Sequence, residues 1–474
     1  MSDLPPWLEQ LLPIIILLVA IAFVLWRVPK VDIGHSPAFK KRRLLNWFPL
    51  GLTYAFLYFG RYNLSANANE LAQYGLATKT EFGQIDGIAS FVYGFAFLLN
   101  GPLTDRWGGR VTILLAAGGS ALMNLALAVV TWAAMNGRLS DHGDVVTLIT
   151  VLYSANMYFQ SFGAVSIVKV NAPWFHVRER GLLGGVFGIL ISLGLYFAYD
   201  WSRLIAKALP SADFYAVFAV PALVLVAFLI IDAFVIRDSP VAAGFAEFDT
   251  GDASSGETGP RLPVLDVLKK MLSNRVILII IAVEFCSGFL RNAVMKWYLI
   301  YAKGIGFSDG FVSKNWGMLL CVAGILGAMF AGLISDYVFD SRRGPVASVL
   351  YGGIVAGSLA TLAMLGMAPL GWVVVFMSLC VIGVHGMLSG TASMDFGGKR
   401  NAGVATGIID GFVYLGTGVQ SILYGIILPS GEAAKVASNW NTWPLAMIPV
   451  AIAGLILATR VWNARPQKQG APSH

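Results

Sequence analysis

Thirteen apolar stretches, comparable in length with a helix that crosses a bilayer, dominate this chain of 474 residues. The first runs from Leu11 to Trp26, and the others are centred near residues 57, 94, 122, 156, 193, 225, 289, 322, 356, 382, 415 and 452. Apolar residue types make up 57% of the chain and charged types only 12%, against about 25% charged in soluble domains. The sequence therefore predicts an all-α polytopic membrane protein with 13 helices.

These stretches form three groups along the chain: the first stretch alone, then a group of six, then a second group of six. The longest polar segment separates the two groups of six stretches. Its middle reads DTGDASSGETGPRLP, which has the composition of a flexible linker. The stretch from Leu11 to Trp26 follows a segment without Lys or Arg and lacks a small-residue cleavage site, so we expect it to stay as an extra helix. The predicted parts are an extra N-terminal transmembrane helix with its cytoplasmic linker at 1–44, six-helix bundles at 45–237 and 274–463, a cytoplasmic central loop at 238–273 and a cytoplasmic tail at 464–474.

Basic residues are distributed unevenly over the predicted loops. If the loop before residue 45 is cytoplasmic, 23 of the 33 Lys and Arg residues lie on the cytoplasmic side and 7 on the opposite side. This bias predicts a multi-pass protein of the cell inner membrane with its N-terminus outside and its C-terminus in the cytoplasm. The net charge of +7 follows from the same bias, so we expect no nucleic-acid partner.

The sequence offers no pattern for cofactor or metal chemistry. Its three cysteines, Cys286, Cys321 and Cys380, lie inside apolar stretches, where a thiol is usually a packing residue. It has no glycine-rich nucleotide-binding loop and no metal-ligand spacing, so we expect neither an enzyme nor an ATP-driven pump. The expected partners are a small solute and membrane lipid, and the chain is predicted to be monomeric.

An internal repeat relates the two predicted bundles. The sequence GPLTDRWGGR, which contains Asp105, recurs in weaker form as GLISDYVFDSRRG, which contains Asp336, 231 residues later. Arg61 and Arg291, two of the three basic residues inside the predicted spans, are 230 residues apart. A duplication that carries both features at one offset predicts that the two bundles are structural copies.

The first copy of this turn has a mechanical interpretation. Its glycines permit close helix contact, and we expect Asp105, Arg106 and Arg110 to form ion pairs that break when the bundles move; Asp336 would be the counterpart in the second copy. The turn resembles the best-known motif of the major facilitator superfamily, and the resemblance covers residues 45 to about 465. It implies a major facilitator fold of two six-helix bundles, a central substrate cavity and alternating access by rocking.

Arg61 and Arg291 are the main candidates for a binding site. An arginine at bilayer depth costs about 2.5 to 3.5 kcal/mol on insertion scales, so each must face protein or a wet cavity. One explanation is that each pairs with a carbonyl or an acid and stabilises packing. The other is that both face one anion, and two guanidinium groups suit a phosphoryl group because each presents paired donors to two oxygens.

Tyrosines accompany both arginines. Tyr54, Tyr58 and Arg61 fall at i, i+4 and i+7 on one helical face. The pairing of these residues with the segment Phe289-Leu290-Arg291 and Trp297 resembles the organophosphate:phosphate antiporters, which include the glycerol-phosphate and hexose-phosphate carriers. The resemblance implies exchange of a phosphorylated organic solute for inorganic phosphate gripped by both arginines, and it adds two cavity tyrosines, Tyr93 and Tyr414.

The sequence also departs from that family. Phe97 stands where its members usually carry a lysine, and Ile191 stands where a histidine is expected. The residues at 163–166 replace the usual Gly-Trp-Pro-Pro run. The anion-gripping core is retained, whereas its auxiliary charges are not, so this chain is a divergent relative.

Ionisable residues in the C-terminal bundle are candidates for coupling. Glu284 precedes Arg291 by seven residues on the same helical face, and Asp410 shares a face with Tyr414. Lys296 lies some 140° around the helix from Arg291, as a separate helper or a residue reaching outward. The remaining coupling candidate is His385, although a lone membrane histidine is as often a packed residue.

Three functions fit these features. The leading hypothesis is a secondary active transporter of a phosphorylated organic anion, driven by exchange for phosphate or by protons. The second is a carrier-like membrane receptor that senses a sugar phosphate, and the third is a proton-coupled drug or metabolite exporter. An exporter of that kind should have buried acids as its dominant charges, whereas here the paired arginines dominate.

Overall fold

The structure is a computed structural model that describes residues 35–176, 188–247, 250, 264–339 and 343–463, together with Ile15 and Val19. Side chains at 264–265, 267, 270, 332–333, 335–337, 343, 389–403 and 405 are not described. The predicted tail, most of the predicted extra helix and the side chain of Asp336 therefore lie outside the described part of the chain.

All regular structure in the described residues is helical. The N-terminal half contains α2 (Pro37–Ala66), α3 (Ala68–Gln73), α4 (Lys79–Trp107), α5 (Gly109–Met135), α6 (His142–Asn171), a helical segment from Gly188 to Ala208 that includes η2 (Phe197–Trp201) and α8 (Ser202–Ala208), and α9 (Ala216–Val235). The C-terminal half contains α10 (Val264–Leu272), α11 (Arg275–Met295), α12 (Trp297–Gly304), α13 (Phe311–Lys314), α14 (Trp316–Val338), α15 (Arg343–Ala363), α16 (Leu370–Ile427) and α17 (Thr442–Arg460). Short helical turns η1 (Ala172–Trp174), η3 (Ser211–Asp213), η4 (Val241–Ala243), η5 (Gly431–Lys435) and η6 (Ala437–Asn441) lie between them.

The helices agree with the apolar stretches of the sequence. Each of the twelve predicted centres from residue 57 to residue 452 lies within a helix. Eight helices of the described residues are long and apolar enough to cross a membrane. Large apolar side chains such as Val129 and Phe234 are 63% and 76% exposed on their outer faces, as expected for surfaces that contact lipid. The all-helical polytopic fold is therefore confirmed, whereas the extra N-terminal helix and the domain boundaries stay predictions.

Helix α16 contains two of the predicted spans. Its first residues lie near α12 and α13, because a Cβ on Gly371 would meet Tyr298 Oη and Val312. Its last turn lies at the start of α4, where Thr80 donates to the carbonyl of Gly425 over 3.0 Å. Since α12 also contacts α3, just before α4, both ends of α16 lie at one end of the molecule, and the chain reverses direction within this helix.

The basic residues before the first bundle are part of a helix. Ser36 caps α2 by accepting from the backbone N–H of Phe39, and Pro37 occupies the first turn, so α2 begins eight residues before the predicted boundary at 45. Arg42 donates to the carbonyl of Val235 over 2.6 Å, and Arg43 donates to the carbonyl of Trp174. These bonds attach the start of α2 to the ends of α9 and α6.

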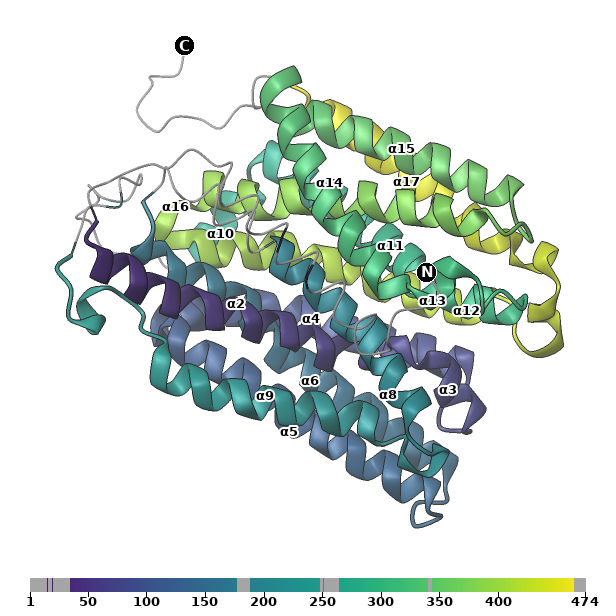
Figure 1. Cartoon of the computed structure of the whole chain (residues 1–474). Helices are drawn as coiled ribbons and strands as arrows, with labels where there is room; N and C mark the ends of the chain where they lie inside the picture. Colours follow the sequence, from purple (N-terminus) through teal and green to yellow (C-terminus); the bar gives the residue numbers. More distant parts are fainter. Residues whose placement is uncertain are drawn as a thin grey trace.

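The two halves lie side by side, and α4 of the N-terminal half meets α16 of the C-terminal half where they join (Figure 1). Helix α4 packs closely on the last part of α16, since a Cβ on Gly83 would lie 2.6 Å from Gly425 Cα. We call the end that carries α3 and α12 the far end, and the end that carries Asp105 the turn end. The far end is closed by bonds between the halves, including Asn69 Nδ2 to the carbonyl of Leu299 and Arg203 Nη1 to the carbonyl of Ser313.

Gly288 brings α11 against α16 at the centre of the molecule. A Cβ on Gly288 would lie 1.8 Å from the carbonyl oxygen of Val413, so no larger residue fits without movement of the backbone. Val413 precedes Tyr414, and Gly288 precedes Arg291 by three residues on the same helix. This close contact therefore fixes how Arg291 lies relative to Tyr414.

We predict that Gly288→Ala lowers the stability of the purified protein by about 1 to 3 kcal/mol, because the added methyl group forces the two helices apart. Thermal unfolding in detergent measures the change. Gly352→Ala is the matched control, since a Cβ at Gly352 meets nothing within 4 Å. Equal midpoints for the two variants would contradict the close contact.

Candidate functional site

Arg61 lies on α2 and is fully buried. Its Nε and Nη2 atoms donate to Gln160 Oε1 of α6 over 3.2 and 3.1 Å, and Tyr153 donates to its backbone carbonyl over 2.7 Å. The guanidinium carbon also lies 4.4 Å from the ring centre of Tyr58 and 4.8 Å from that of Tyr93. A neutral amide and aromatic faces thus stabilise this charge, and the described residues place no carboxylate at ion-pairing distance from it.

Arg291 lies on α11 in the other half of the chain. Its guanidinium carbon is 5.3 Å from the ring centre of Tyr414 on α16, and the residue is 9% exposed. Tyr414 Oη accepts a bond from Arg61 Nη1 at 3.4 Å. The structure therefore brings both predicted arginines to one tyrosine, and their role in binding an anion stays a prediction.

The other predicted tyrosines complete an aromatic group around these charges. The rings of Tyr54 and Tyr58 meet edge to face with centres 5.4 Å apart, and those of Tyr93 and Tyr414 lie 4.2 Å apart. Phe97, which replaces a lysine of the resembled family, stacks on Tyr414 with an interplanar angle of 8°. An aromatic ring here shields the arginines from water and removes one positive charge from the site.

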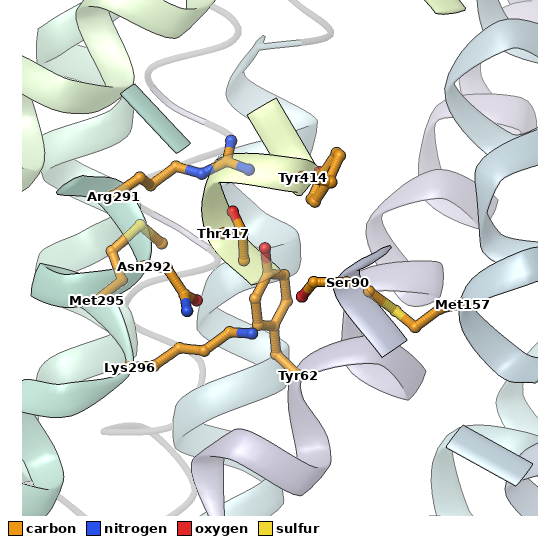
Figure 2. A pocket seen from close by; sticks show the side chains of 9 residues that line it. All are labelled: Tyr62, Ser90, Met157, Arg291, Asn292, Met295, Lys296, Tyr414 and Thr417. Atoms are coloured by element: carbon orange, nitrogen blue, oxygen red, sulfur yellow. The ribbon is translucent and has the colours of Figure 1, made fainter. Parts of the chain in front are cut away.

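A small cavity lies beside Arg291 in the middle of the molecule (Figure 2). Its volume is about 10 Å³, which is room for about one water molecule. Its lining residues come from both halves and are Tyr62, Ser90, Met157, Arg291, Asn292, Met295, Lys296, Tyr414 and Thr417. This conformation is closed around the site, so a larger solute requires the halves to separate.

Lys296 has a buried partner that the sequence reasoning did not find. Its Nζ lies 2.5 Å from Asp86 Oδ1 of α4, and both side chains are almost completely buried. Ser421 and Asn292 donate to the other oxygen of Asp86 over 2.5 and 3.4 Å. The available signal was the position of Asp86, seven residues before Tyr93 on the same face of one helix.

Two further coupling candidates lie next to each other. His385 Nδ1 of α16 is 3.3 Å from Glu284 Oε2 of α11, and the Glu284 side chain is fully buried. Both residues belong to the C-terminal half. Asp410, also on α16, is 7% exposed. The coupling roles of these residues stay predictions.

The turn between α4 and α5 forms contacts with neighbouring helices. Asp105 Oδ1 pairs with Lys169 Nζ of α6 at 2.7 Å. Arg110 donates from Nη2 to the carbonyl of Ala233 on α9 over 2.5 Å, and its backbone N–H donates to Asp238 over 2.8 Å. The side chain of Arg106 is exposed. Lys169 and Asp238 are thus partners that sequence spacing did not indicate, and the gating role of the turn stays a prediction.

The described residues contain no group of three or more His, Cys, Asp or Glu side chains that could hold a metal ion. Cys286, Cys321 and Cys380 are free and buried. The polar groups at the centre are guanidinium, ammonium, amide and hydroxyl groups.

Comparison with known proteins identifies the family. The profile of the Major Facilitator Superfamily matches residues 50–421, which is most of the chain. The chain belongs to this superfamily. It is a secondary transporter by family and not an enzyme, in agreement with the function class predicted from the sequence.

Three proteins are similar to this superfamily member over most of its length at low sequence identity. It is 26% identical to the glycerol-3-phosphate transporter of Bacillus subtilis over 459 residues, covering 91% of this chain and 95% of the relative. It is 23% identical to the membrane sensor protein UhpC of Salmonella typhimurium, covering 90% and 92%. It is 22% identical to a probable hexose phosphate transport protein of Chlamydia trachomatis, covering 92% and 94%. The resemblance to organophosphate carriers is thereby confirmed at the level of distant homology.

A solved structure shows the same fold. A bacterial homologue of the human lysosomal transporter Spinster, in an inward-facing and unoccupied conformation, matches with a TM-score of 0.67. The match covers 92% of this chain and 100% of the other, at 10% sequence identity. It supports the major facilitator architecture of this superfamily member.

Gln160 gives a direct test of how Arg61 is held. We predict that Gln160→Leu lowers stability by about 1.5 to 3 kcal/mol, because a buried charged donor loses its acceptor. Gln160→Glu should be more stable than the leucine variant and less stable than wild type, since it keeps the acceptor for Arg61 and loses the amide donation to the carbonyl of Leu57. It should weaken binding of inorganic phosphate, since its charge neutralises Arg61. Thermal unfolding and phosphate titration of the purified protein measure the two effects. Wild-type stability of the leucine variant would contradict the assignment.

Proposed function

We propose that this transporter carries a phosphorylated organic anion across the cell inner membrane, in exchange for inorganic phosphate or together with protons. The observation that carries the proposal is the meeting of Arg61 and Arg291, from opposite halves, at Tyr414. The named functions of several distant relatives, which are glycerol-3-phosphate and hexose phosphate transporters, support the same class of solute.

The charges of the site suit a phosphoryl group. Neither guanidinium has a carboxylate at ion-pairing distance among the described residues, so the two positive charges are available to a solute. A phosphate monoester carries a charge of about −1.5 to −2 near neutral pH, which two arginines would balance. A monocarboxylate would leave one of the two buried charges uncompensated.

Buried acids are less suited than the two arginines to be the main functional groups of the site. Asp86 is paired with Lys296, and Glu284 lies beside His385. These pairs favour a solute that is itself the anion over an exporter that works mainly through protonation of acids. If protons accompany uptake, Glu284, His385 and Asp410 are the residues proposed to carry them.

The similarity to the sensor UhpC favours one other function, that of a receptor. A receptor would bind phosphate or a phosphate ester without moving it across the membrane. Counterflow of labelled phosphate in proteoliposomes separates the two: the transporter accumulates label against its gradient, whereas a receptor does not. A competition panel of phosphate esters would then identify the organic part.

We predict that Arg61→Lys and Arg291→Lys each reduce phosphate counterflow at least tenfold, because lysine keeps the charge and loses the paired donors of guanidinium. The measurement is initial counterflow, normalised to the amount of reconstituted protein. Thermal unfolding of each variant checks that folding is intact. Counterflow at half the wild-type rate or better would make that arginine structural and remove the main support for a phosphate substrate.

Asp105 lies far from the tyrosines of the site, at the turn end. We predict that Asp105→Asn slows counterflow and leaves phosphate affinity within about twofold, because the ion pair with Lys169 acts on the balance between conformations and not on the solute. Comparison of counterflow rate with phosphate affinity of the purified variant makes the distinction. A loss of affinity equal to the loss of rate would contradict a mechanical role.

A further inference from the structure

Asp86 is a carboxylate of the N-terminal half that is held by the C-terminal half. Among the described residues it accepts from Asn292 of α11, from Lys296 directly after that helix and from Ser421 of α16, whereas Asp86 itself lies on α4. Asp86 is fully buried and Lys296 is 3% exposed. Separation of the halves at the far end would therefore break this ion pair and expose both charged side chains to water.

Closure without a partner would be costly for Lys296. An unpaired ammonium in a protein interior costs several kcal/mol, because water no longer solvates it. The ion pair with Asp86 removes most of that cost in the closed conformation. Each closed state of the molecule must supply Lys296 with some negative charge.

A bound anion could supply that charge instead. Lys296 and Asn292 line the cavity beside Arg291, and Figure 2 shows the ammonium of Lys296 directed toward the ring of Tyr62, 5.3 Å from its centre. An anion held by Arg291 would lie within one or two helical turns of Lys296, since five residues of a helix span about 7.5 Å. Asp86 is therefore most needed when the site is empty.

We propose that Asp86 is the built-in counter-ion of Lys296 that allows the transporter to close, and so to return, with its site empty. The proposal rests on the proposed function in the form that permits net transport together with protons, because a strict exchanger does not return with its site empty. Loss of the Asp86 charge would penalise the empty closed state and spare the loaded one, because the solute then balances Lys296. Exchange would continue, and net transport would fail.

The experiment compares these two modes in proteoliposomes loaded with labelled phosphate. Efflux into phosphate-free buffer measures net transport, and efflux into buffer with phosphate measures exchange. We expect Asp86→Asn to lower the ratio of net transport to exchange at least tenfold, which corresponds to about 1.4 kcal/mol. The ratio does not depend on how much protein is active.

Two variants separate charge from structure. Asp86→Asn combined with Lys296→Gln removes both charges and should bring the ratio back to within about twofold of wild type. Asp200→Asn is the matched control. Asp200 is a partly buried acid of the N-terminal half that also meets the C-terminal half, where it accepts from the backbone N–H groups of Gly317 and Met318 at 2.9 and 2.8 Å, and it does not line the cavity. Its loss weakens closure with or without an anion, so the ratio should stay unchanged.

An unchanged ratio in Asp86→Asn, a double variant as impaired as the single one, or a wild type that exchanges phosphate without net efflux would overturn the proposal. If Asp86→Asn is too unstable to reconstitute, its thermal unfolding in detergent provides the test. Added phosphate should raise the unfolding midpoint of the variant by more than it raises the midpoint of wild type. An equal rise would overturn the proposal. Absence of phosphate exchange in the wild type would reject the proposed function instead. The thermal comparison, made with sulfate as well as phosphate, then tests Asp86 separately.

Discussion

Two guanidinium groups buried without a carboxylate partner among the described residues are the constraint on which the centre of this molecule depends. Their charges cannot be neutralised by deprotonation, since arginine stays protonated in proteins. The surroundings therefore stabilise them without cancelling them. Gln160 offers a neutral acceptor to Arg61, and the faces of Tyr58, Tyr93 and Tyr414 lie against the guanidinium groups. The site keeps a positive potential that an anion can use.

Repeated opening is a second constraint, and it explains why the far end is closed by polar contacts. A carrier must separate its halves many times, and a purely apolar interface at the far end would expose apolar surface to water at each opening. Asp86 and Asp200 instead meet donors of the other half. Hydrogen bonds and ion pairs of this kind exchange for bonds to water at small net cost, so the closed state can be stable without being permanent.

The departures from the organophosphate carriers acquire a physical meaning in this arrangement. Phe97 stacks on Tyr414 where a lysine would have added a charge. A cation is present on the other side of the cavity, at Lys296, together with its own acid. The chain thus combines the arginine pair suggested by the resemblance with an auxiliary cation at Lys296.

The sequence by itself determined the helices, the superfamily and the two arginines, because hydrophobic length, an internal repeat and the cost of intramembrane charge are local or periodic properties of the chain. The partners of those charges were decided by the tertiary structure. Gln160 is 99 residues from Arg61, and Asp86 is 210 residues from Lys296. Such contacts depend on how each helix is rotated and how closely glycines let helices approach, as Gly288 does against Val413. Periodicity indicates the face on which a residue lies, and only packing decides what that face meets.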